Sequence, residues 1–285
     1  AAGLRLAAGY PGSPSTDIIE TLVRERRAGV DVQWSVNEKA TLEVAAGGAY
    51  AGARTMCTMK QVGLNVASDP LMSLAYIGVK GGMVVAVADD PGPWSSQTEQ
   101  DTRNFAKHAN LPVFDPSSPE EAYEMIQTAF DFSEKFELPV FLRPTTRVCH
   151  ASAEVKLREP SPVKEADGFE RRPEWCIFPA LSYRKHGELE VKQHEMARAF
   201  DAMPYNRIET YGAGSRRAVA ASGISYLYAK EALNELGADA TLYKVGTPYP
   251  MPEKLTQDFL AGADSVLVLE ELDPVVEEQL LIEAA

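Results

Sequence analysis

The sequence has 285 residues, of which 45% are hydrophobic and 24% charged, a balance that is typical of a folded chain and excludes a disordered one. A chain of this length is expected to form about two domains. Acidic residues outnumber basic ones by 41 to 28, and the net charge of −13 disfavours nucleic acid and anionic membranes as partners. No apolar run approaches the roughly 18 residues of a membrane-spanning helix.

The cysteines exclude several kinds of site. Cys57, Cys149 and Cys176 are widely separated and form no CxxC pair, so a disulfide framework, a zinc ribbon and an iron–sulfur ligand set are not expected. A reducing, cytoplasmic setting fits this usage best. The chain begins with Ala1 and stops in an apparent helix over 274–285, and a fragment of a longer subunit is one explanation that stays open.

Strand-like and helix-like segments alternate along the chain, which predicts an α/β fold of two domains with mainly parallel sheets flanked by helices. The first domain is expected to cover residues 1–152. Its expected strands span 4–8, 30–35, 55–59, 83–88 and 139–143. Its expected helices are one that starts at Ser13, one capped by Asn37, and three over 66–77, 97–108 and 119–135.

Beyond this domain, the charged and proline-containing stretch 153–203 is expected to be a connecting arm with one helix near 187–202. A second domain over 204–285 resumes the alternation. Its expected elements are strands over 218–222, 240–245 and 265–270, and helices over 224–236 and 253–261.

Two local patterns refine these expectations. Ser118 and Glu121 form a capping-box pattern, in which each side chain satisfies a backbone N–H of the helix start. Glycine and alanine crowd residues 45–53 of the helix that follows Asn37. Either another backbone approaches closely there or the helix is wedged against its own sheet, and both explanations remain open.

Parallel α/β sheets bind ligands at the carboxyl ends of their strands, which directs attention to the loops 10–14, 35–38, 60–65 and 89–97. The first loop is rich in glycine and proline, but it is neither GxxxxGK[ST] nor GxGxxG, and a tight turn explains its composition. In the last loop, the Asp89-Asp90 pair could hold a cation, although a turn is the simpler explanation.

Glu38 directly follows the probable N-cap Asn37. A carboxylate in the first turn is favoured by the helix dipole alone, which is a sufficient structural explanation. Its flanks, however, are Trp34, Val36 and a glycine–alanine helix rather than charged neighbours. We therefore expect a carboxyl group that is shielded from solvent and suited to proton transfer.

A set of short motifs covers essentially the whole chain. In order, the motifs are GYPGSPS (9–15), WSVNEK (34–39), GAR (52–54), VGLNVA (62–67), DPLM (69–72), KGG (80–82), ADDPG (88–92), SSQ (95–97), GTPYP (246–250) and EELDPVVEE (270–278). Together they resemble the first half of the large subunit of the indolepyruvate:ferredoxin oxidoreductases, which are thiamine-diphosphate-dependent 2-oxoacid:ferredoxin oxidoreductases.

The resemblance implies that the first domain holds the aminopyrimidine of thiamine diphosphate and that the second is a transketolase-C-like domain. Glu38 falls at the position of the glutamate that contacts the pyrimidine ring nitrogen in this family, which makes it the implied catalytic residue. Two further stretches match family loops that face cofactor and substrate. They are Tyr10, Pro11, Gly12 and Ser13, and Gly63, Leu64 and Asn65.

The resemblance also implies an activity, the oxidative decarboxylation of indolepyruvate or another arylpyruvate to the acyl-CoA with transfer of electrons to ferredoxin. The family's Mg²⁺- and diphosphate-binding motif and its cysteine clusters for [4Fe–4S] are absent from this sequence. They are expected on a missing half or on partner chains, including a smaller subunit in a homo- or hetero-oligomer. This chain alone is not expected to turn over.

One departure bears on the substrate. Pyruvate-specific relatives have an arginine near the loop that we place at Asp89 and Asp90, and no arginine aligns there, which favours a bulkier arylpyruvate. Two alternatives remain open. One is another thiamine-diphosphate 2-oxoacid enzyme, such as a decarboxylase, and the other is a non-catalytic assembly subunit that keeps the fold.

Overall fold

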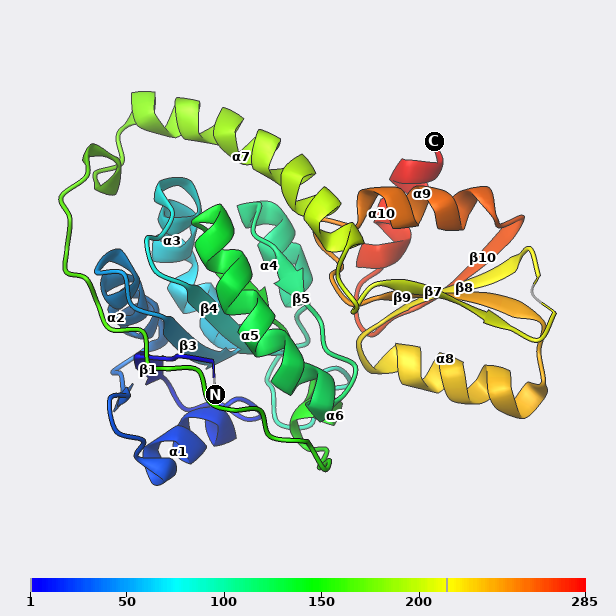
Figure 1. Cartoon of the computed structure of the whole chain (residues 1–285), viewed down its shortest axis with the longest axis horizontal. Coiled ribbons are helices and arrows are strands. Elements are labelled where there is room, and N and C mark those ends of the chain that lie inside the picture. The colour runs from blue at the N-terminus through cyan, green and yellow to red at the C-terminus, as the bar shows by residue number, and fades with distance from the viewer. Residues whose placement is uncertain (1, 214) are drawn as a thin grey trace.

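The structure, a computed structural model, describes residues 2–213 and 215–285. It contains a six-stranded sheet and a four-stranded sheet, which lie on opposite sides of the molecule in Figure 1. Helices flank both sheets, so the expected α/β class is confirmed. No helix in the part of the chain that the structure describes is long and apolar enough to cross a membrane.

The six-stranded sheet is parallel throughout, with the order β2-β1-β3-β4-β6-β5. Its strands are β1 (Leu6–Gly9), β2 (Asp31–Trp34), β3 (Thr55–Lys60), β4 (Met83–Ala88), β5 (Val113–Phe114) and β6 (Val140–Leu142). The central strands β3 and β4 are buried along their whole length, as expected where helices cover both faces of a parallel sheet. β2 lies at an edge and is largely exposed. This sheet organises the first core.

The helices of this part are α1 (Thr16–Glu25), α2 (Glu38–Tyr50), α3 (Gln61–Ile77), α4 (Thr102–Ala109), α5 (Pro119–Phe136) and α6 (Thr146–Cys149). Several begin elsewhere than expected. The N-cap of α1 is Ser15 rather than Ser13, and α4 begins after Asp101, whose side chain accepts a hydrogen bond from Arg103 N. α3 follows β3 directly, so the expected loop 60–65 is mostly helix.

Within α2, the two glycines differ. A Cβ on Gly48 would lie 2.8 Å from Thr55 and 2.9 Å from Leu6, both on strands of the sheet, whereas nothing lies within 4 Å of a Cβ on Gly47. At Gly48 the helix is therefore wedged against its own sheet, which was one of the two explanations for the glycine–alanine composition.

The connecting stretch follows the surface of the first part before it enters α7 (Pro179–Asp201), which runs along the upper side in Figure 1. Backbone hydrogen bonds from Lys164 to Gly3 and from Gly168 to Ala51 tie it down. α7 is longer than expected, and Phe200 stacks on Phe132 with 4.6 Å between ring centroids. The end of the arm thus belongs to the first core.

The second sheet has the order β10-β8-β9-β7, with β7 antiparallel to β9 and the other pairs parallel. Its strands are β7 (Arg207–Tyr211), β8 (Arg217–Ser222), β9 (Ala240–Val245) and β10 (Ser265–Leu269). Its helices are α8 (Gly223–Leu236), α9 (Glu253–Ala261) and α10 (Val275–Ala284). The strand β7 was not expected. The domain boundaries near 152 and 204 stay a prediction.

Candidate functional site

The carboxyl ends of the strands of the six-stranded sheet lie along one edge, because all of its strands are parallel. The residues singled out from the sequence leave this edge after β1, after β2 and after β3. In open α/β sheets, ligands bind at this edge. The edge is therefore the place to look for a site.

Glu38 is the first residue of α2, and its neighbour Asn37 caps the helix by accepting a hydrogen bond from Ala40 N at 2.8 Å. A Cβ on Gly63 would lie 2.5 Å from both Cγ and Oε1 of Glu38, so the side chain of Glu38 lies directly on the first turn of α3. Within residues 2–213 and 215–285, this carboxylate has no hydrogen-bond or ion-pair partner. Its oxygens are free to meet a ligand.

The expected shielding of this carboxyl group is not provided by its flanks. Glu38 is half-buried, while Trp34 is 40% exposed and Val36 is 83% exposed. The physical reason is that β2 is an edge strand, with no neighbouring strand on its outer side. In this chain the apolar residues beside Glu38 form an open surface rather than a cover.

The loop after β1 is a tight turn around Gly12. The carbonyl oxygen of Gly12 accepts hydrogen bonds from Ser15 N at 2.9 Å and from Ser15 Oγ at 2.7 Å. A Cβ on Gly12 would lie 2.9 Å from Cβ of Lys60, so only glycine allows this close approach. The turn leaves Pro11 and Ser13 exposed, and Tyr10 is half-buried.

The residues at the start of α3 point in different directions. Gly63 contacts Glu38, and exposed Asn65 donates a hydrogen bond from Nδ2 to Oε1 of Gln100 at 3.1 Å. Leu64 is fully buried in the hydrophobic core. The structure therefore brings Gly63 and Asn65 to the candidate edge, while the side chain of Leu64 points away from it.

Lys60, the last residue of β3, is a functional candidate that the sequence did not single out. It is only 9% exposed, and its Nζ donates hydrogen bonds to Ser95 O at 2.9 Å and Ser95 Oγ at 3.4 Å. Ser95 Oγ in turn donates to Ser13 O at 3.3 Å. In the described part of the chain this ammonium pairs with no carboxylate. A lysine at the end of an apolar strand was the available signal.

Asp90 organises the loop after β4. Its Oδ2 accepts from Trp94 N at 3.1 Å, Ser95 N at 3.0 Å and Ser96 Oγ at 2.6 Å, and its Oδ1 accepts from Thr146 Oγ1 at 2.6 Å. Burial alone would raise the pKa of Asp90, but the hydrogen bonds from Ser96, Thr146 and the loop amides outweigh it and hold the pKa well below its usual range. The carboxylate is thus occupied by protein donors.

Asp89 lies behind this loop, against a buried arginine that directly follows β6. Arg143 Nε donates to Asp89 Oδ2 at 2.7 Å, and its Nη1 lies 3.3 Å from Asp115 Oδ1. Burial raises the pKa of Asp89 and raises that of Asp115 to about 6, although Arg143 opposes both shifts. An arginine does lie beside Asp89, but it is buried and cannot receive a substrate.

A second buried arginine joins the two sheets. Arg103 donates to Asp101 at 2.5 Å, to Glu270 Oε2 at 2.8 Å and to the carbonyl oxygen of Glu271 at 2.7 Å. Because Arg103 is on α4 and the other two acceptors follow β10, the second sheet is held against the loop that ends at Asp101.

A cavity of about 490 Å³ opens beside these loops. It is lined by Ser13, Pro14, Trp94, Ser95, Thr146, Arg147 and His150. In the described residues, no group of three or more histidine, cysteine, aspartate or glutamate side chains is placed to hold a metal ion.

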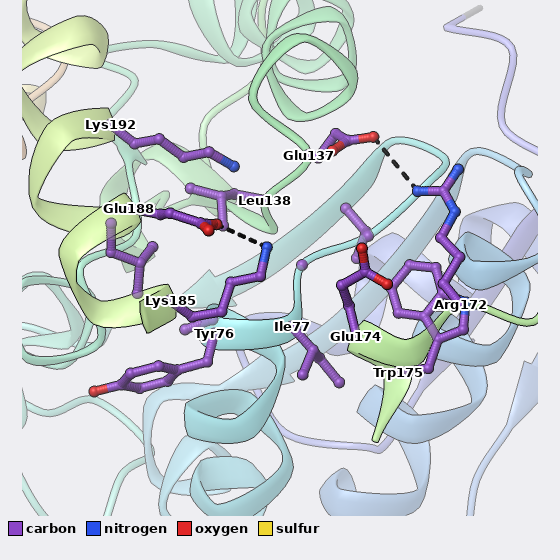
Figure 2. A pocket seen from close by; sticks show the side chains of 14 residues that line it. Tyr76, Ile77, Glu137, Leu138, Arg172, Glu174, Trp175, Lys185, Glu188 and Lys192 are labelled. Carbon is purple, nitrogen blue, oxygen red and sulfur yellow. Dashed lines mark ion pairs between the residues drawn. The ribbon is translucent and has the colours of Figure 1, made fainter. Parts of the chain in front are cut away.

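Another hollow, at the opposite edge of the sheet, is much smaller, with a volume of only about 50 Å³. Figure 2 shows two ion pairs in its lining, one between Lys185 and Glu188 at 2.9 Å and one between Arg172 and Glu137 at 3.8 Å. It lies where the connecting stretch meets the first core. We interpret this hollow as part of the packing between the connecting stretch and the first core, and not as a ligand site.

Comparison with known proteins gives a consistent result. The family model for the thiamine diphosphate-binding region of pyruvate flavodoxin/ferredoxin oxidoreductases matches residues 1–184. The indolepyruvate oxidoreductase subunit IorA of Pyrococcus horikoshii is 44% identical over 283 residues, which is 96% of this chain and 44% of that protein. The subunit of the same name from Methanothermobacter thermautotrophicus is 44% identical over 98% of this chain and 46% of that protein.

The chain thus spans less than half the length of these relatives. A solved 2-oxoglutarate:ferredoxin oxidoreductase from Magnetococcus marinus, with 2-oxoglutarate, coenzyme A and succinyl-CoA bound, superposes with a TM-score of 0.77. The superposition covers all of this chain and 58% of that one, at 16% identity, so this likeness concerns the fold alone.

Proposed function

Because this chain belongs to the thiamine diphosphate-binding family of the pyruvate flavodoxin/ferredoxin oxidoreductases, we propose that it holds the pyrimidine ring of that cofactor in a 2-oxoacid oxidoreductase. In this proposal residues 1–152 form the pyrimidine-binding domain and residues 204–285 a transketolase-C-like domain, joined by the arm 153–203. Glu38 is the catalytic residue, and Tyr10, Pro11, Gly12, Ser13, Gly63 and Asn65 lie around cofactor and substrate.

The single observation that carries the proposal is the free carboxylate of Glu38, half-buried on Gly63 at the carboxyl edge of the sheet. No donor in the described residues occupies this carboxylate, so its oxygens are available to a ligand. The missing side chain at position 63 makes room for the Glu38 side chain, which lies where a Cβ would be. The residues present therefore fit a planar ring whose nitrogen shares a proton with a carboxyl group.

Each protein group has a defined task in this scheme. When bound, thiamine diphosphate supplies a carbon nucleophile that adds to the keto group of a 2-oxoacid and allows CO2 to leave. Glu38 holds a proton at its carboxyl oxygen, facing the ring. Lys60 holds the Ser95 loop, and Ser95 Oγ in turn donates a hydrogen bond to Ser13 O. The exposed Trp34 and Val36 fit a surface that a partner chain covers and so dries.

The proposed substrate, product and electron acceptor rest on the relatives named indolepyruvate oxidoreductase. We propose that the complete enzyme oxidises indolepyruvate or another arylpyruvate in the cytoplasm and forms the acyl-CoA from coenzyme A. Its Mg²⁺, its diphosphate-binding half and its [4Fe–4S] clusters belong to the rest of the subunit or to partner chains, including a smaller subunit. Electrons then pass to ferredoxin.

The test compares Glu38→Gln with Glu43→Gln in the complete enzyme, since Glu43 is an exposed acid on the same helix. Proton exchange at C2 of bound thiamine diphosphate is expected to slow by about 10²- to 10⁴-fold in Glu38→Gln and to stay unchanged in the control. Equal exchange rates in the two variants would contradict the role of Glu38.

A second assay addresses the reaction. The unmodified enzyme is expected to reduce viologen when supplied with indolepyruvate and coenzyme A. Release of an aldehyde without viologen reduction would instead identify a decarboxylase, and a native complex without thiamine diphosphate would identify an assembly subunit.

A further inference from the structure

The cavity of about 490 Å³ is formed by three stretches that are distant in the sequence but meet at the carboxyl edge of the first sheet. Ser13 and Pro14 follow β1, Trp94 and Ser95 follow β4, and the remaining wall is α6, which follows β6. Pockets for small molecules usually have volumes of roughly 300–1,000 Å³. The cavity thus has the size of a substrate site.

The lining joins a cationic end to an aromatic surface. The Arg147 side chain is 41% exposed and uses one nitrogen, Nη1, to pair with Glu271 Oε1 at 2.5 Å, which leaves its other donors free. His150 is exposed beside it. Trp94 is 76% exposed, and within the described residues its indole ring has neither a hydrogen bond nor a stacked ring. Such a lining suits a ligand that carries both a carboxylate and a flat ring.

The walls are fixed before any ligand arrives. The Asp90 carboxylate accepts from Trp94 N and Ser95 N on one wall and from Thr146 Oγ1 on the other. The Oγ of Ser95 donates to Ser13 O, which joins the third wall. The backbone of the cavity wall therefore loses little conformational entropy on binding, while the exposed Trp94 ring stays free to settle on a ligand.

We propose that this cavity is the binding site for an aryl 2-oxoacid, in which Arg147 receives the carboxylate and Trp94 stacks on the aryl ring. The choice of a 2-oxoacid rests on the proposed function, through Ser13, which belongs to the loop assigned to cofactor and substrate. A guanidinium group binds a carboxylate through two parallel N–H···O bonds, which a lysine cannot reproduce. Arg147 receives the carboxylate that all 2-oxoacids carry, and the stacking surface of Trp94 selects for an aromatic acid over pyruvate.

The experiment uses the complete enzyme and the variants Arg147→Met and Trp94→Ala. Arg158→Met is the matched control, because Arg158 is an exposed arginine, 3.7 Å from an exposed Glu124, and does not line the cavity. Charge-assisted hydrogen bonds contribute about 1.5–3 kcal/mol, so we expect Arg147→Met to raise the KM for indolepyruvate by about 10- to 150-fold with little change in kcat. Trp94→Ala is expected to raise the KM for indolepyruvate about 5-fold more than that for pyruvate.

Coenzyme A also carries an aromatic base and anionic groups, so its KM is measured in parallel and is expected to stay unchanged. A shift in the KM for coenzyme A alone, or an indolepyruvate KM equal to that of Arg158→Met, would overturn the proposal. If the unmodified enzyme reduces viologen with no 2-oxoacid, the proposed function fails. In that case, the equilibrium affinities of wild type and Arg147→Met for indolepyruvate are compared. Equal affinities would show that the cavity is not the binding site.

Discussion

Adding one methyl group at Gly63 tests the role of Glu38 without altering the carboxyl group itself. A Cβ at this position would lie 2.5 Å from Cγ and Oε1 of Glu38, whereas ordinary contact begins at 3.4 Å, so the Glu38 side chain must move by about 1 Å. The displaced atoms belong to a flexible, half-exposed side chain, and alanine is favoured over glycine in a helix by about 1 kcal/mol, so the fold is expected to tolerate the change.

Misplacing a catalytic group by about 1 Å lowers a rate on the order of 100-fold. We therefore expect Gly63→Ala in the complete enzyme to slow proton exchange at C2 of thiamine diphosphate about 100-fold while thermal unfolding is unchanged. Gly47→Ala is the matched control, because Gly47 is exposed on the helix of Glu38 with no atom within 4 Å of an added Cβ. Equal exchange in the two variants would show that the contact with Glu38 has no catalytic consequence.

Two further outcomes concern the residues behind the site. Burial raises the pKa of Asp115 from 3.8 to about 6. The folded chain therefore binds the Asp115 proton more tightly than the unfolded chain does. The stability that results is present below pH 3.8 and is lost as the pH rises through about 6. Asp115→Asn is therefore expected to gain stability relative to wild type between pH 4 and pH 7, on the order of 3 kcal/mol in urea unfolding, and a pH-independent difference would contradict this. Lys60→Met removes the hydrogen bond to Ser95 O. The backbone amides near Ser95 are then expected to exchange hydrogen with solvent about 5-fold faster. Unchanged exchange rates would exclude a role for Lys60 in holding that loop.

The regular elements could be predicted where local signals agreed with the final packing. The strand over 240–245 and the helix over 253–261 have the bounds that the sequence indicated, and Asn37 caps its helix as expected. The strands β5 and β7 were missed for different reasons. β5 has only two residues, and β7 is an antiparallel edge strand with alternating charged residues that resembles a loop.

At the starts of α3 and α5, tertiary contacts produced a structure that differs from the one the local sequence predicted. The stretch 60–65 was expected to be a loop, yet it is mostly helix, and the small size of Gly63 lets Glu38 lie on the first turn of α3. The capping box at Ser118 is half formed, with its Oγ accepting from Glu121 N at 3.2 Å. The Glu121 carboxylate instead binds Ser117 N and the ammonium group of Lys244, which belongs to the second sheet.

The site itself was only partly predictable. Glu38 could be found because an N-cap and a strand end are local features. The pairing of Arg143 with Asp89 across 54 residues, and of Arg103 with Glu270 across 167, depends on strand order and on how the two sheets meet. No spacing rule in a single sequence encodes such pairs, which is why no arginine could be assigned beside Asp89.

These distant pairs also explain how residues beyond the first sheet shape the candidate site. Glu270 binds buried Arg103, and the adjacent Glu271 binds Arg147 in the cavity wall. Breaking a buried pair by removing one partner costs about 3–5 kcal/mol, so Glu270 is strongly held in place. Because Glu271 is its neighbour in the chain, the same anchor limits where the Arg147 guanidinium can lie. The position of the proposed carboxylate-binding group is therefore set by the second sheet as much as by the first.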